Sequence, residues 1–158
     1  MEEAQIHPLP GQDRWSAQQI IEHLILTYKL TSDSVDKQLK SGRVPKNKRN
    51  MLEFVLRVQT IALGHMPGGV PAMRAVRPNQ VTPEAGSAIA ARFLQAAEEM
   101  DALLVAGRKK FGIQACGRHP FFGVMRIDEW RRYHAVHAHH HEAQLKNAIR
   151  YAQSLKTS

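Results

Sequence analysis

The chain has 158 residues, of which 43% are hydrophobic and 23% charged, a composition typical of a soluble globular protein. This length suits one ordinary domain over residues 1–158, and no run approaches the roughly 20 apolar residues that span a bilayer. The acidic N-terminus does not resemble a secretion signal, and the single cysteine, Cys116, excludes an internal disulfide. These features predict a cytoplasmic location without a membrane partner.

The net charge of +8, with a pI near 10.0, invites a comparison with nucleic-acid-binding proteins. However, the basic residues are dispersed, and the densest group lies in a connection that contains glycine and proline: Arg43, Lys46, Lys48 and Arg49. The sequence contains no helix-turn-helix, zinc-finger or aromatic-rich binding pattern. We therefore expect a solvated basic surface and no nucleic-acid partner.

The first predicted helix covers residues 15–39, with Ser16 as its N-cap and Gln19 able to return the hydrogen bond. Its apolar stripe predicts one buried face, and Ser41 and Gly42 are expected to end it. A shorter helix is predicted over residues 50–63. Five of its side chains recur on one side, which is expected to face the core: Leu52, Val55, Leu56, Gln59 and Leu63.

A connection rich in proline and glycine follows over residues 65–81, and loops of this length often shape the mouth of a site. Thr82 and Pro83 then read as the N-cap and first residue of a third helix, which ends near Gly107. A second loop covers residues 108–126, and a last helix covers residues 127–155. No segment has strand periodicity, so we expect an all-α fold, a four-helix bundle.

The last helix carries five histidines within eight positions: His134, His137, His139, His140 and His141. His137 and His141 differ by about 40° around the helix and share its apolar seam with Trp130 and His134. Such a pair can direct its ring nitrogens at one metal ion. His134 with His137, and His137 with His140, are alternative pairs, and all of them contain His137. By contrast, His139 points away from the seam and is expected to be exposed.

A third ligand must come from elsewhere in the chain. His23 lies in the apolar stripe of the first helix, where a buried imidazole needs a partner. His7, His65 and His119 fall in loops or the terminus and are weaker candidates, although His119 could orient a ligand or a bound water. The sequence therefore predicts a metal site in which His23 joins two histidines of the last helix.

Three segments together resemble the DinB-like (YfiT-like) superfamily. They are Trp15-Ser16 followed by Glu22-His23-Leu24, then His119-Pro120-Phe121-Phe122-Gly123, and finally the helix from Trp130 through the histidines to Gln144-Leu145. The resemblance implies a four-helix bundle, commonly a homodimer, with His23, His137 and His141 as metal ligands. It also implies relatives such as thiol S-transferases, which activate a low-molecular-weight thiol, and a maleylpyruvate isomerase.

Three neutral imidazoles leave a coordination position open, as in a catalytic site. Zinc or nickel suits such ligands, and iron or manganese is compatible with them. The first hypothesis is a metal-dependent enzyme that transfers a thiol to a small electrophile. It predicts a cavity above the metal, lined by residues 65–81 and 108–126. The alternative is a non-catalytic metal- or ligand-binding stress protein with a closed site. Neither Glu22 nor Glu142 is expected to act as a general base, and Cys116 is expected to be incidental.

Overall fold

The computed structural model describes residues 15–46, 50–68, 71–78 and 82–155. These residues form four α-helices and a two-stranded hairpin, which confirms the expected all-α class in its broad form. The elements are α1 (Ala17–Ser41), α2 (Met51–Arg57), α3 (Gly86–Phe111), β1 (Ala115–His119), β2 (Gly123–Arg126) and α4 (Ile127–Ser154). A π-helical turn (Val58–Ala62) continues α2, and a short 3₁₀ helix (Arg74–Val76) lies in the connection to α3.

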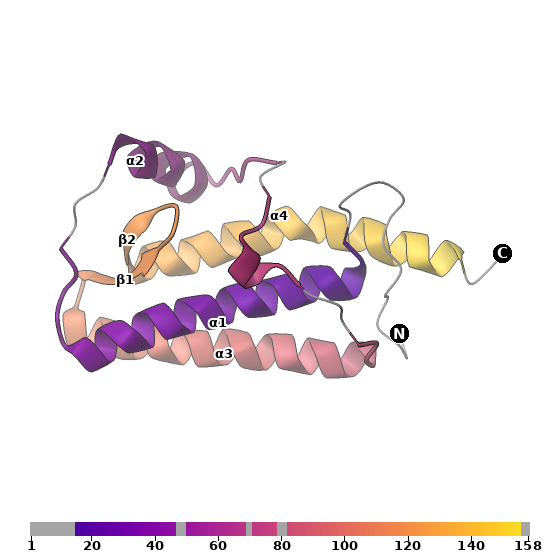
Figure 1. The fold of residues 1–158 in the computed structure, drawn as a ribbon, viewed down its shortest axis with the longest axis horizontal. Coiled ribbons are helices and arrows are strands. Elements are labelled where there is room, and N and C mark those ends of the chain that lie inside the picture. The colour runs from indigo at the N-terminus through magenta and orange to yellow at the C-terminus, as the bar shows by residue number, and fades with distance from the viewer. Residues whose placement is uncertain (1–14, 47–49, 69–70, 79–81, 156–158) are drawn as a thin grey trace.

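The three long helices run side by side, with α1 and α3 parallel and α4 antiparallel to both (Figure 1). Near their C-terminal ends, Lys110 of α3 donates to the carbonyl of Leu39 in α1 at 2.6 Å. The second helix has only seven residues and lies over the hairpin, outside this group of three (Figure 1). A bundle of four long helices is therefore not confirmed.

Helix α1 begins and ends as the sequence predicts. Ser16 accepts from the backbone N–H of Gln19, and the Gln19 side chain accepts from the N–H of Ser16, which completes a capping box. Gly42 ends the helix with φ of 67°, a left-handed conformation that glycine adopts without strain. These local signals place His23 on a regular helix, one turn from the buried Thr27.

Both predicted ends of α3 are wrong. Ala85, without a side-chain cap, precedes the helix, and the carbonyl of Thr82 instead accepts from Gln18 of α1 at 2.7 Å. At the other end the helix passes through Gly107 and continues to Phe111. A Cβ at Gly107 would lie 3.0 Å from the Cys116 sulfur, so this glycine allows the hairpin to approach the helix closely.

The absence of strands is also wrong. β1 and β2 pair antiparallel, with Ala115 opposite Arg126 and His119 opposite Gly123, and the register shifts between these pairs. The two strands have five and four residues and are mostly buried, so they lack the alternation that reveals a strand in sequence. The hairpin matters for the site because it carries His119 towards α4.

Helix α2 is inverted relative to the expectation. Leu52, Val55 and Leu63 are 67%, 50% and 73% exposed, whereas Glu53 and Arg57 are buried. Of the predicted inward face, Leu56 alone packs against the main core as a partly buried side chain. The reason is a set of polar contacts with the hairpin side of the molecule. Arg57 donates to the carbonyls of Phe122 and Val124 and pairs with Glu129, while Glu53 pairs with Arg118.

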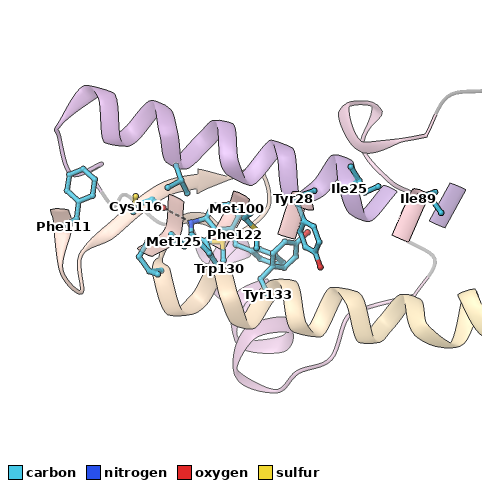
Figure 2. Packing of buried hydrophobic residues seen from close by; sticks show 14 residues of the cluster. Ile25, Tyr28, Ile89, Met100, Phe111, Cys116, Phe122, Met125, Trp130 and Tyr133 are labelled. Carbon is cyan, nitrogen blue, oxygen red and sulfur yellow. Dashed lines mark hydrogen bonds between the residues drawn. The ribbon is translucent and has the colours of Figure 1, made fainter. Parts of the chain in front are cut away.

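The main core joins the three long helices to the hairpin (Figure 2). Trp130 of α4 is 1% exposed, and its indole N–H donates to the carbonyl of Cys116 in β1 at 2.7 Å. This hydrogen bond fixes the hairpin against the first turns of α4. None of the described helices is long and apolar enough to cross a membrane.

Candidate metal centre

His23, on α1, is held by the connection that precedes α3. Its Nδ1 lies 2.7 Å from the carbonyl oxygen of Val76, and its side chain is buried. A carbonyl can only accept, so Nδ1 must carry the proton. In the neutral ring, Nε2 then presents a lone pair, and this lone pair faces α4.

His137 and His141 present their Nε2 atoms to the same point from α4. The Nε2 of His137 lies 3.1 Å from the Nε2 of His23 and 3.1 Å from the Nε2 of His141. The other ring nitrogen of His141, Nδ1, is hydrogen-bonded to Oε1 of Gln144 at 2.9 Å. The structure thus brings together His23, His137 and His141, the three histidines expected as ligands, and we call them the histidine cluster.

The spacing of these nitrogens fits a shared divalent ion. Two nitrogens bound tetrahedrally at about 2.05 Å lie about 3.3 Å apart, close to the 3.1 Å between neighbours here. The three candidate ligand atoms all lie within 4.8 Å of one another. The cluster therefore has the composition and the dimensions of a three-histidine metal site.

Hydrogen bonding within the cluster cannot satisfy all three rings. With Nδ1 as the donor in both His23 and His141, each presents an Nε2 lone pair to His137. A neutral His137 has at most one Nε2 proton, which can serve only one of them. A cation at the centre would satisfy all three lone pairs at once.

Burial keeps the three rings neutral. It lowers the pKa of His137 to about 2 and that of His141 to about 4, each helped by the neighbouring histidines, and it also lowers the pKa of His23. A neutral imidazole is the form that binds metal. Trp15 covers the cluster, with ring centroids 4.9 Å from His23 and 6.4 Å from His141.

The other histidines lie outside the cluster. His134 is buried, and its Nε2 lies 3.0 Å from the hydroxyl of Thr31, while its Nδ1 and that of His137 have no partner among the described residues. His139 is exposed, as expected, and contacts Glu142. His140 is half-buried on the flank, and His65 is exposed. His7 lies outside the described residues.

The histidine cluster opens into a cavity of about 930 Å³. The cavity is lined by parts of the two loops expected there, including Met66, Met73, Arg118 and Phe121, and by residues of α1 and α4. Leu52 and Leu56 of α2 also line it, whereas the apolar spacing of this helix predicts that they face the core. The cavity is large enough for a small organic molecule.

Neither acidic residue next to a cluster histidine reaches this cavity. Glu22 pairs with Arg92, and Glu142 pairs with Lys146. Both are absent from the cavity lining among the described residues. Two contacts that support the cluster, the Val76 carbonyl and Trp15, were not foreseen, and a backbone carbonyl leaves no signal in a sequence.

Cys116, on β1, is buried against α3 and does not belong to the described cavity lining. Burial raises the pKa of its thiol to about 11. Since the thiolate is the reactive form, we expect almost no modification of the native protein by a disulfide reagent at pH 8. Complete modification is expected after unfolding in guanidinium chloride. Absorbance of the thiolate released from the reagent measures the modification rate of the native and of the unfolded protein. Fast stoichiometric labelling of the native chain would contradict the buried position of Cys116.

The fold and the site thus define a class: a helical protein with a buried three-histidine cluster at the wall of a cavity. The chain belongs to the family described as Protein of unknown function (DUF1569), whose profile matches residues 1–148. No curated protein and no solved structure matches the chain.

Proposed function

We propose that this protein is a divalent-metal-dependent enzyme, distantly related to the DinB-like bundle proteins, that acts on a small molecule in the cavity. The observation that carries the proposal is the convergence of three Nε2 lone pairs, from His23, His137 and His141, at the wall of a cavity of about 930 Å³. A non-catalytic protein with a closed site would not need this space. We extend the proposal to one domain and a cytoplasmic location, without nucleic-acid or membrane partners.

The ligand set suits zinc or nickel. A divalent ion in this position supplies Lewis-acid activation of a thiol or a water molecule. The three neutral imidazoles leave its charge uncompensated, which favours an anionic partner such as a thiolate. Trp15 packs against the ring of His23, and the Val76 carbonyl accepts from its Nδ1, so both contacts hold this ring in place.

The reaction that we propose is the transfer of a low-molecular-weight thiol to a small electrophile. The test is a conjugation assay with zinc- or nickel-loaded protein, a panel of low-molecular-weight thiols and chlorodinitrobenzene as the electrophile. Turnover above the uncatalysed rate is expected with at least one thiol, together with its loss in His137→Ala. Unchanged turnover in His137→Ala, or none with any thiol, would contradict this reaction. The exposed His139→Ala serves as the matched control.

We also propose that the chain forms a homodimer through α2 and the turn that follows it. Five exposed apolar side chains of this segment lie outside the cavity lining: Met51, Phe54, Val55, Val58 and Leu63. Two copies related by a two-fold axis would bury these side chains of one copy against the same side chains of the other. Light scattering after size exclusion should show a dimer for the wild type and a monomer for Phe54→Glu. Leu94→Glu, on the exposed face of α3, should remain dimeric; a monomeric wild type would contradict the proposal.

A further inference from the structure

The walls of the cavity carry hydrogen-bond donors and positive charge. Among the described residues, its lining contains two arginines, Arg77 and Arg118, and neither aspartate nor glutamate. The guanidinium of Arg118 is bound by Glu53 at 2.9 Å. Arg77 directly follows Val76, which holds His23, and its guanidinium has no ion-pair partner in the described part of the chain. Away from the histidine cluster, the charges of the lining therefore favour an anionic group of an organic ligand over a cationic one.

His119 presents a proton to this cavity. Its Nδ1 accepts from the backbone N–H groups of Phe121 and Phe122, at 3.1 and 3.4 Å, so the proton of the neutral ring is on Nε2. Burial lowers the pKa of His119 to about 3, which keeps the ring neutral. Nε2 has no partner within the described ranges, yet it is not among the fully buried unpaired atoms. It therefore borders the space that His119 lines.

Tyr133 lies between His119 and the histidine cluster. Its ring centroid is 4.7 Å from that of His119 and 5.4 Å from that of His137, on which it stacks. Its hydroxyl also lacks a partner among the residues described and is not fully buried. The two rings that carry these neutral donors, Tyr133 and His119, are thus in contact with each other next to the cluster.

The rest of the cavity is largely apolar. The apolar side chains that line it include Leu52, Leu56, Met66, Met73, Phe121 and Phe122. An occupant with an apolar body would bury it against these residues, and its polar group would then lie towards Tyr133 and His119. A carboxylate has two acceptor oxygens, which matches the two donors.

We propose that the cavity binds a small organic carboxylate whose oxygens accept from His119 Nε2 and Tyr133 Oη, with its apolar part against α2 and the neighbouring loops. This inference rests on the proposed function in taking that molecule as the substrate of the metal centre. His119 and Tyr133 are then substrate-binding residues, and Arg77 contributes favourable charge.

The test is calorimetric binding of 3-phenylpropionate, compared with its primary amide and with 3-phenylpropylamine. The protein is measured as purified and again after removal of metal with a chelator. We expect the carboxylate to bind about tenfold more tightly than the amide in both forms, because hydrogen bonds to a charged acceptor are the stronger ones. Absence of carboxylate binding, or equal binding of the amine, overturns the proposal.

Variants identify the donors. Tyr133→Phe removes one hydroxyl and is expected to weaken carboxylate binding about tenfold, with binding of the amide changed much less. His119→Gln keeps an acceptor for Phe121 and an N–H for the ligand, so it should retain more affinity than His119→Phe. The exposed His139→Gln is the matched control. Wild-type affinity in both Tyr133→Phe and His119→Phe overturns the proposal.

The chelated protein separates this proposal from the proposed function. Carboxylate binding that disappears on chelation and is insensitive to Tyr133→Phe would mean that the metal alone holds the ligand, which overturns the donor assignment and leaves the metal enzyme intact. Conversely, selective binding without any metal in the purified protein would support the carboxylate site while contradicting the metal-dependent function. Metal content of Tyr133→Phe should equal that of the wild type.

Discussion

Adding zinc to the metal-free protein is expected to raise its free energy of unfolding by about 4 kcal/mol when the free ion is about 1,000 times its dissociation constant. The reason is that His23 meets helix α4 only in the folded chain. There the Nε2 atoms of His23 and His141 each lie 3.1 Å from the Nε2 of His137. The unfolded chain has no such preformed site. Denaturant titration with and without zinc measures the difference.

The same titration on two alanine variants locates the effect. His137→Ala removes the ring common to both short contacts, so its zinc-dependent stabilisation should vanish. His139→Ala, whose side chain is exposed two residues along the same helix, should keep the full effect. Equal stabilisation of His137→Ala and wild type would show that zinc acts elsewhere on the chain.

Replacing Trp130 with alanine is expected to lower the free energy of unfolding by about 3–5 kcal/mol. The indole is 1% exposed and lies where α4 meets the hairpin (Figure 2). Its removal leaves a cavity and also leaves the buried carbonyl of Cys116 without its donor. Against a typical total stability of about 5–15 kcal/mol, this is a large fraction.

Trp130→Phe separates the two contributions, because it keeps much of the ring volume and loses the indole N–H. We expect a cost of about 1–3 kcal/mol for that variant. Leu94→Ala, on the exposed face of α3, should change stability by less than about 0.5 kcal/mol. Urea denaturation monitored by circular dichroism suits all three variants. A cost for Trp130→Ala below that of Leu94→Ala would contradict the packing described.

The histidine helix was predictable because its periodicity is long and regular. Residues buried on α4 include Trp130, His134, His137 and His141, which the sequence had placed on one seam. The ends of helix α1 were equally predictable, since Ser16, Gln19 and Gly42 cap it through contacts with residues only a few positions away. Where a feature depends on local spacing or on a local cap, the chain alone is informative.

The inversion of α2 could not be read from its own residues. Its apolar positions predict an inward face, but Arg57 finds two carbonyls and Glu129 on segments more than 60 residues away. Such partners become known only after the chain has folded. The start of α3 failed for the same reason, because Gln18, far away in sequence, holds the Thr82 carbonyl.

The histidine cluster lies between these cases. The pair on α4 follows from helical geometry, whereas the role of His23 came from the family resemblance together with its apolar stripe. The carbonyl of Val76 that fixes the proton on His23, and the paired donors of His119 and Tyr133, depend on the connection before α3 and on the hairpin. Both of these segments lacked a periodic signal.

The most direct test of the central claim is the metal content of protein purified without a histidine tag, measured by mass spectrometry for the wild type, His23→Ala and His141→Ala. We predict about one divalent ion per wild-type chain and its loss from both variants, because each supplies one of three converging nitrogens. A metal-free wild type, or undiminished metal in His23→Ala, would contradict the three-histidine centre.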